Sequence, residues 1–277
     1  MNVNVSSLLV SSLRVSSIRK TNNKKWAVSQ AFSKAAHQYD RHAAFQRSVG
    51  DRLMDKLPLD LNGMRVLDVG CGTGHFSQLI RARGADVVCL DLSTSMLEHA
   101  QARCGCDQMT YYQGDAEALP FPDASFDYVF SSLALQWCDD LHVPLKEIRR
   151  VLKNQGKGLF TTLVDGSLYE LAQAWSSVDA YQHINQFVSV NEVKIALAQA
   201  DIAEVTLEFD PITVWYVTAM DLMKDLKGIG ANHVPGRATR MISKQVLSQV
   251  EESYQSFRGP NGLLPATYQV CLGVILR

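Results

Sequence analysis

A short glycine-rich segment is the part of the sequence best suited to hold a ligand. The run VLDVGCGTGHF at residues 66–76 ends an apolar stretch with Asp68 and then places Gly70, Gly72 and Gly74 at alternate positions. Glycines let the backbone turn sharply and a ligand lie against it, and a following helix offers free amide groups. The spacing differs from the G-x-G-x-x-G pattern that binds pyrophosphate. A strand-to-helix turn without a ligand is the alternative interpretation.

Two further acids are expected beside this segment. Asp91 ends the next apolar stretch, 23 residues after Asp68, and Asp115 follows the third one. Because the carboxyl ends of parallel strands share one edge of a sheet, the three side chains should converge on one crevice. Their carboxylates can accept hydrogen bonds from ribose hydroxyls and from an adenine amino group. Three acids therefore favour a ligand with neutral and cationic groups over a phosphate.

The elements that must position these acids alternate along the chain. Uniformly apolar stretches are typical of buried parallel strands, and helices between them imply right-handed crossovers. The sequence predicts an α/β fold with a doubly wound, mostly parallel seven-stranded sheet whose last strand is antiparallel. The strand candidates are 65–69, 86–90, 109–113, 128–131, 157–163, 204–209, 212–217 and 268–276, and the helices between the first five are 75–83, 93–103 and 144–152.

Residues before and after this alternation suggest additional parts. Amphipathic spacing over residues 28–57 predicts helices that are broken near Asp40 or Gly50. Residues 1–39 contain six bases and no acid, which fits a disordered leader, a transit segment or an upstream translation start. We expect a flexible leader over 1–25, a helical lid over 26–57, a cofactor-binding half over 64–164, and a substrate half over 165–277 with an insertion at 218–260.

The overall composition excludes several classes of protein. The 277 residues are 47% hydrophobic and carry 27 Lys and Arg against 28 Asp and Glu, as in ordinary globular proteins. The longest apolar runs are far shorter than the roughly 20 residues of a membrane span. The chain after residue 39 is acidic, which argues against nucleic-acid binding. Six cysteines without a CxxC pair predict reduced thiols in a cytoplasmic protein and no metal site.

The glycine segment and the three acids resemble those of the class I S-adenosylmethionine-dependent methyltransferases, which have a Rossmann-like fold. The D-x-G-x-G-x-G loop, the acid after the second strand, the Asp after the third and the segment 118–137 all have counterparts here. The resemblance implies that Asp68 binds the amino group of S-adenosylmethionine, Asp91 the ribose and Asp115 the adenine amino group. The other implied cofactor contacts are Gly70, Cys71, Gly72, Gly74, Leu92, Met96, Ala116 and Ser131.

Four other segments resemble the malonyl-acyl-carrier-protein O-methyltransferase family of biotin synthesis. They are residues 31–47, 133–141, 160–171 and 226–233, and the resemblance extends over roughly residues 25–277. It implies methyl transfer from S-adenosylmethionine to the free carboxylate of a malonyl thioester on acyl-carrier protein, with S-adenosylhomocysteine as the other product. A methyltransferase of a quinone precursor or small metabolite is the nearest alternative. A non-catalytic adenosyl-binding module is the alternative outside enzymes.

This reaction demands alignment and exclusion of water rather than a general base or a metal, because a carboxylate is already a nucleophile. The resemblance points to Tyr39 and His42 of the lid as substrate-positioning residues. Gln136 and Trp137 follow the fourth strand, where an amide can orient the acyl group and an aromatic ring can form a wall. Packing in the core is the alternative role for Tyr39 and Trp137.

Residues 222–245 form a basic block in an otherwise acidic body, with Asp225 as its single acid. A basic surface suits a small acidic carrier protein, so docking is expected here. A solvated helical surface is the alternative. The basic residues are Lys224, Lys227, Arg237, Arg240 and Lys244.

Overall fold

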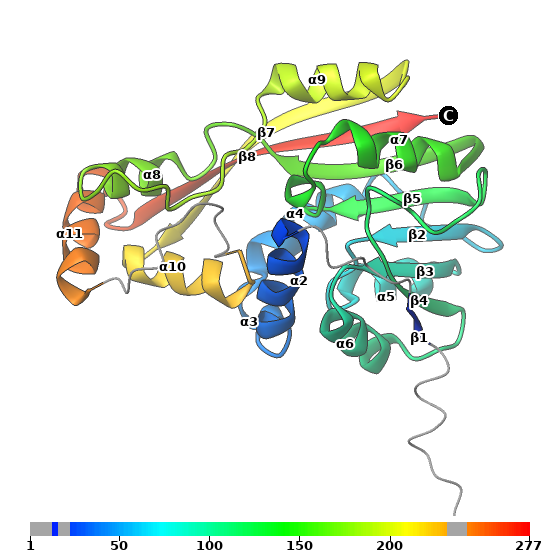
Figure 1. The fold of residues 1–277 in the computed structure, drawn as a ribbon, viewed down its shortest axis with the longest axis horizontal. Helices are drawn as coiled ribbons and strands as arrows, with labels where there is room; N and C mark the ends of the chain where they lie inside the picture. The colour runs from blue at the N-terminus through cyan, green and yellow to red at the C-terminus, as the bar shows by residue number, and fades with distance from the viewer. Residues whose placement is uncertain (1–12, 16–22, 232–242) are drawn as a thin grey trace, which may run out of the picture.

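The computed structural model describes residues 13–15, 23–231 and 243–277, and its centre is one eight-stranded sheet (Figure 1). The strand order is β1-β4-β3-β2-β5-β6-β8-β7. β8 is antiparallel to both of its neighbours, and all other paired strands are parallel, which confirms the predicted α/β class. The strands are β1 (Leu13–Val15), β2 (Arg65–Val69), β3 (Asp86–Asp91), β4 (Met109–Gln113), β5 (Phe126–Ser132), β6 (Leu152–Leu163), β7 (Glu204–Tyr216) and β8 (Leu264–Leu276).

Helices cover both faces of the sheet. Because β2 is flanked by β3 and by β5, the strand order reverses beside β2, and a doubly wound sheet opens a crevice at such a point. The helices that follow β2 and β3 pack on one face, and the helix that follows β5 packs on the other (Figure 1). They are α5 (His75–Ala82), α6 (Thr94–Cys104) and α7 (His142–Val151), with α8 (Tyr169–Ser176) and α9 (Val190–Gln199) further along the chain.

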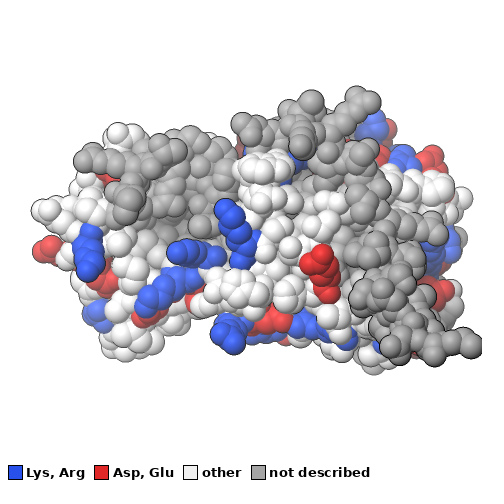
Figure 2. All heavy atoms as spheres, turned by 60° about the horizontal axis from the view of Figure 1, so that its bottom comes forward, with Lys and Arg blue, Asp and Glu red and all other residues white. Residues whose placement is uncertain are grey.

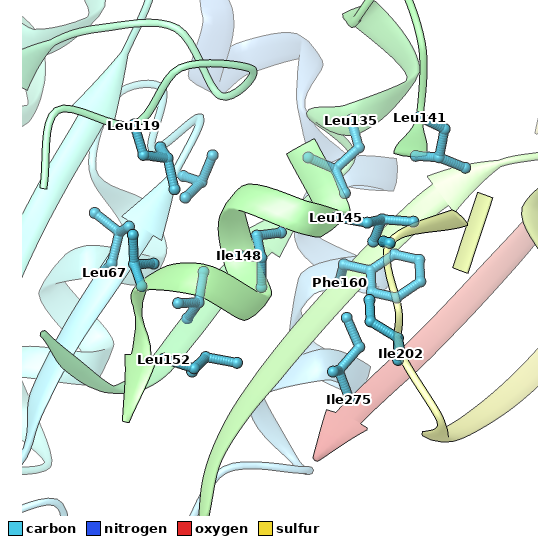
Figure 3. Packing of buried hydrophobic residues seen from close by; sticks show 14 of the residues in the cluster. Leu67, Leu119, Leu135, Leu141, Leu145, Ile148, Leu152, Phe160, Ile202 and Ile275 are labelled. Atoms are coloured by element: carbon cyan, nitrogen blue, oxygen red, sulfur yellow. The ribbon is translucent and has the colours of Figure 1, made fainter. Parts of the chain in front are cut away.

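The packing of α7 on the sheet shows why these residues form a stable layer. Figure 3 shows Leu145 and Ile148 of α7 facing the sheet, with Phe160 of β6 and Ile275 of β8 beside them. All four side chains are at most 1% exposed. Burial of each such side chain contributes about 1.5–3 kcal/mol, so this face holds the strand ends in fixed relative positions.

Strands β6 and β8 begin five and four residues earlier than predicted, at Leu152 and Leu264, and a further difference joins two predicted strands. The two candidates at 204–209 and 212–217 form a single strand, β7, which continues through Pro211. Proline lacks the N–H that a central strand needs, but β7 is the edge strand and uses only one side for pairing. β1 was not predicted. Its three residues pair with β4, so the sheet has eight strands instead of the expected seven. It lies within the predicted leader, and the rest of residues 1–22 falls outside the described residues.

The segment predicted to be a lid, for which we keep that name, forms three helices, α2 (Asn23–Ala35), α3 (Tyr39–His42) and α4 (Ala44–Met54). The break near Asp40 is confirmed, since the chain leaves the helix between residues 35 and 39 and again at Ala43. The alternative break at Gly50 is wrong, because Gly50 lies inside α4. A Cβ atom added to Gly50 would lie 2.0 Å from the ring of Phe76 on α5, so this glycine permits close packing instead.

Gly50→Ala is therefore expected to destabilise the protein by about 1–3 kcal/mol through overpacking, although alanine is favoured over glycine in helices by about 1 kcal/mol. Unfolding in urea measures this difference. Ser48→Ala, at an exposed position of the same helix, should change the free energy of unfolding by less than about 0.5 kcal/mol. A Gly50→Ala protein as stable as the parent would show that α4 does not rest on Phe76.

The predicted insertion contains α10 (Ala219–Gly228) and α11 (Lys244–Tyr254), which lie between β7 and β8 in the chain. Both pack with α8 and the far end of β8 in an apolar cluster, which includes Trp175 and Tyr254. In the ribbon, α10 lies next to α3 of the lid (Figure 1). Among the helices of the described ranges, none is long and apolar enough to cross a membrane.

Candidate active site

The glycine segment after β2 forms a tight turn against β3. The amides of Gly70 and Cys71 both donate to the carbonyl of Leu90, at 2.7 and 3.1 Å. Gly70 has φ +73°, and a Cβ there would lie 2.4 Å from Cβ of Ala134. Gly72 has φ +53°, but an added Cβ would meet nothing within 4 Å. The turn therefore needs glycine at Gly70 for packing, whereas Gly72 borders open space.

Asp91 connects this turn to the end of β3. Its Oδ2 accepts from the amide of Gly72 at 2.9 Å, and its Oδ1 accepts from the amide of Ser93 at 2.8 Å. Burial raises the pKa of Asp91 to about 6, although these backbone hydrogen bonds oppose the shift. The carboxylate is thus held in a fixed orientation, with remaining lone pairs available to hydroxyl donors of a ligand.

Asp68 is the more deeply buried acid, with 2% exposure. Ser77 donates its hydroxyl to Oδ2 of Asp68 at 2.5 Å. Burial raises the pKa of Asp68 to about 7, and the charge of Asp91 adds to the shift against the effect of Ser77. A cationic ligand group beside Asp68 would stabilise the ionised form that burial disfavours.

Two adjoining cavities lie along the glycine turn and share Tyr39, Gly70, Gly72 and Ser132. The first, which we call the strand-edge cavity, runs beside the ends of β3 and β4. The second, the loop cavity, lies over the turn and the start of α5. The strand-edge cavity is also lined by Val28, Ser29, Phe32, Leu90, Asp91, Leu92, Met96, Gly114, Ala116, Leu133, Ala134 and Trp137. The loop cavity is also lined by Asp40, Ala43, Gln46, Arg47, Asp68, Cys71, Thr73, His75, Phe76 and Phe130.

These two cavities fit S-adenosylmethionine. The open space above Gly72 is a cradle that any side chain would fill. Asp91 borders one cavity and Asp68 the other, so acceptors for hydroxyl groups and for an ammonium group stand at separate ends. Among the described residues lining the strand-edge cavity, Leu92, Met96 and Ala116 supply the apolar surface that a base requires.

The lid lies directly over these cavities. Lys25 of α2 forms ion pairs with Asp115, at 2.5 Å, and with Glu117. Burial lowers the pKa of Lys25, but the two carboxylates outweigh it and raise the pKa overall. Further along α2, Ser29 donates to the carbonyl of Leu92 at 3.0 Å. These contacts attach α2 to the ends of β3 and β4.

A third cavity, which we call the apolar cavity, adjoins the other two. Tyr39 lines all three, so they meet at this side chain. Gln136 and Trp137 also line the apolar cavity, and Phe32 packs edge-on against Trp137 with ring centres 5.2 Å apart. The predicted aromatic wall is thus at a cavity surface. The remaining lining residues are Phe45, Gln46, Leu133, Leu163, Leu168, His183, Ile184, Asn185, Phe187, Leu226, Ile229, Ala231 and Tyr268.

Several predicted contacts lie outside the cavities. Ser131 is buried and donates to the carbonyl of Val69 at 2.9 Å, while the next residue, Ser132, lines both the strand-edge and the loop cavities. Gly74 packs against α6, since a Cβ there would lie 2.9 Å from Ala100. The carboxylate of Asp115 pairs with Lys25 beside the strand-edge cavity instead of lining it.

His42 is also placed away from the cavities. Its Nδ1 lies 2.7 Å from Oδ1 of Asp225 on α10, and its ring fills the space that a side chain at Gly228 would need. This contact joins the lid to the insertion. The structure therefore gives His42 a role in holding α3 against α10, and its predicted contact with substrate does not follow from this position.

Three of the five predicted docking residues are described. Lys224, Lys227 and Lys244 are exposed on α10 and at the start of α11, whereas Arg237 and Arg240 lie outside the described residues. Lys224 pairs with Asp221 at 3.0 Å. Figure 2, which brings the lower side of Figure 1 forward, shows basic side chains spread over this face, with acidic side chains between several of them.

Sequence reasoning missed Lys25, Gln46 and His183. Lys25 belongs to a basic N-terminal stretch that gave no sign of pairing with acids 90 residues away. Gln46 and His183 lie in segments that meet only around the apolar cavity. The helical spacing of 28–57 placed Gln46 on α4 but could not show what it faces.

Comparisons with known proteins agree with this geometry. Residues 67–160 match the family model described as "Methyltransferase domain". The chain is 44% identical over 259 residues to the malonyl-[acyl-carrier protein] O-methyltransferase of Erwinia pyrifoliae, covering 93% of this chain and 95% of that protein. It is 39% identical to the biotin biosynthesis bifunctional protein BioHC of Cellvibrio japonicus, over 89% of this chain and 49% of that protein.

The fold has solved counterparts as well. A crystal structure of a putative methyltransferase from Bacillus halodurans superposes with a TM-score of 0.59 at 21% identity, and covers 83% of this chain and 98% of that one. At this level of identity the similarity extends to the fold alone.

Proposed function

Because the chain belongs to the malonyl-[acyl-carrier protein] O-methyltransferase family, we propose that it methylates the free carboxylate of a malonyl group on acyl-carrier protein in biotin synthesis. The oxygen-to-methyl bond that forms replaces the sulfur-to-methyl bond of S-adenosylmethionine, so a carboxylate and a sulfonium become a neutral ester and a thioether. The observation that carries the proposal is the junction at Tyr39, where an apolar cavity adjoins two cavities suited to the cofactor.

When bound, S-adenosylmethionine supplies a methyl group already activated by the positive sulfur. The strand-edge cavity is suited to its adenosine part, with Asp91 accepting from the ribose hydroxyls. The loop cavity is suited to its methionine part, with Asp68 beside the ammonium group. The apolar cavity is then left for the malonyl thioester, next to the methyl group.

The protein's contribution is alignment and exclusion of water. Phe32 and Trp137 line both the strand-edge and the apolar cavities, so two aromatic rings would flank the place where the reacting groups meet. Among the described residues that line the apolar cavity there is no Lys, Arg, Asp or Glu. Since two charged reactants become two neutral products, an apolar environment favours the transfer over the charged starting state. Orientation alone can supply several kcal/mol.

Mass spectrometry of malonyl-acyl-carrier protein after incubation with the enzyme and S-adenosylmethionine tests the proposal. We expect a gain of one methyl group that mild base hydrolysis removes, as an ester requires. No mass change, with cofactor binding intact, would overturn the carrier substrate and favour a small metabolite or quinone precursor instead.

Two exposed lysines, Lys227 on α10 and Lys244 at the start of α11, support docking of the acidic carrier on this face. We expect the double variant Lys227→Glu, Lys244→Glu to lower kcat/KM for the carrier substrate by about tenfold, because two attractive contacts become repulsive. With malonyl-CoA, which lacks the carrier surface, the rate should not change. Lys194→Glu, exposed on α9 away from this face, is the control. Equal kcat/KM for the double variant and the parent would rule out this surface.

A further inference from the structure

Buried polar atoms without hydrogen-bond partners collect around the apolar cavity. The described part of the chain has four such buried side-chain atoms. Three of them, Gln46 Oε1, Gln136 Oε1 and His183 Nδ1, belong to residues that line this cavity, and the fourth, His142 Nδ1, does not. An unsatisfied buried polar atom destabilises the folded state, and native structures contain few of them. Their convergence on one cavity indicates that a ligand with polar groups completes them.

The three groups are not equivalent. Gln136 donates its Nε2 to the carbonyl of Leu133 at 2.7 Å, which leaves its oxygen as an acceptor only. His183 has its Nε2 2.8 Å from Asp179, and its ring stacks on Trp175 with centres 3.6 Å apart. Both side chains are thereby held in place. An acceptor oxygen cannot bind a carboxylate, so Gln136 suits a donor such as an amide N–H of the carrier's thioester arm.

Gln46 differs because no side-chain hydrogen bond to another described residue holds its amide. Its neighbour Phe45 is fixed by stacking on Tyr268, with ring centres 3.9 Å apart, so the start of α4 is anchored while the amide can turn about its last bond. That turn exchanges Oε1 for Nε2. Gln46 can therefore present N–H donors to an acceptor in the cavity.

The position of Gln46 matches the place where the methyl group must be received. It lines the apolar cavity and also the loop cavity, which holds Asp68 and the glycine turn. Tyr39 is the other residue that lines both. Arg47, the next residue along the chain, lines the loop cavity alone and donates to the carbonyl of Asp40 at 2.7 Å.

We propose that Gln46 is a substrate-positioning residue that binds the malonyl carboxylate through its amide N–H, with the Tyr39 hydroxyl as a second neutral donor. This inference rests on the proposed function. Neutral donors orient the nucleophilic oxygen without pairing it with a fixed positive charge, so the carboxylate keeps its reactivity toward the sulfonium. Burial and the charges of Asp91 and Asp40 raise the pKa of Tyr39, which keeps its hydroxyl protonated as a donor.

The test compares binding of the malonyl substrate with binding of its methyl-ester product. In Gln46→Leu, of similar size, affinity for malonyl-acyl-carrier protein should fall roughly tenfold or more through loss of a charge-assisted hydrogen bond. Affinity for the methyl-ester carrier should change less than about twofold, because the ester has no carboxylate. S-adenosylhomocysteine is held saturating in both titrations. Gln136→Leu is the control and should leave the ratio of the two affinities unchanged.

A second variant, Gln46→Glu, keeps the size of the side chain and changes only its charge. In Gln46→Glu, kcat/KM should be low at pH 8, where two carboxylates repel, and should recover toward pH 5.5 as the new side chain is protonated and becomes a donor. A merely structural role for Gln46 would affect acid and ester equally and would overturn the inference, as would a pH profile like that of the parent. If the parent enzyme forms no malonyl ester, the proposed function itself is wrong. If the parent is active but Gln46→Leu leaves the ratio of the two affinities unchanged, only the inference about Gln46 is wrong.

Discussion

Gly72→Leu is expected to weaken binding of S-adenosylmethionine by at least about a thousandfold and to abolish turnover. The glycine has φ +53° and faces open space that belongs to both the strand-edge and the loop cavities. A leucine side chain would occupy this space, and its backbone strain would cost about 1–2 kcal/mol in addition. Isothermal titration with the cofactor measures the loss.

Gly63→Leu separates the effect of filling the cavities from the effect of backbone strain. Gly63 has φ +74°, and an added Cβ there would also meet nothing within 4 Å, but it lies in the exposed turn before β2 and lines none of the three cavities. Both variants should therefore lose similar stability, measured by thermal unfolding, and only Gly72→Leu should lose the cofactor. Full cofactor affinity in Gly72→Leu would show that the turn is not the binding surface.

Local patterns in the sequence were sufficient to predict the sheet and the cofactor loop. The apolar runs before Asp68 and Asp91 are strands with the expected bounds within one residue. Both acids emerge at the same sheet edge, because parallel register alone brings strand ends together. Where a prediction depended on counting along a strand, it could fail by one position. Ser131 and Ser132 point to opposite faces, and only the second reaches the cavities.

The substrate side could not be predicted in the same way. The apolar cavity takes Gln46 from α4, Gln136 after β5, His183 from the segment before α9 and Leu226 from α10. No spacing rule links residues so far apart in the chain. Residue type alone was also insufficient: His42 was predicted to contact the substrate, but in the structure its ring pairs with Asp225. Identifying such residues requires the three-dimensional contacts.

The second large effect is expected at Asp68, where binding and stability should change in opposite directions. Asp68→Asn is similar in size but cannot become negative, so at pH 8 affinity for S-adenosylmethionine should fall roughly 30-fold, or about 2 kcal/mol, through loss of the contact with the ammonium group. Without cofactor, burial raises the pKa of Asp68 to about 7, well above that of an unfolded chain. The folded protein therefore binds the proton more tightly, and its stability falls as the pH rises from about 4 to about 7. The stability of Asp68→Asn should not fall in this way as the pH rises.

The same linkage makes cofactor affinity depend on pH. Because the ionised form of Asp68 is the one that pairs with an ammonium group, affinity of the parent should fall about tenfold for each pH unit below about 7. Asp68→Asn should be nearly flat between pH 8 and 6, and Asp91, with its pKa near 6, adds a further fall below that in both proteins. Asp86→Asn, exposed at the opposite end of β3, is the control and should follow the parent. A pH-independent affinity in the parent would mean that Asp68 does not bind the charged group, because a buried acid of raised pKa cannot pair with a cation without releasing its proton.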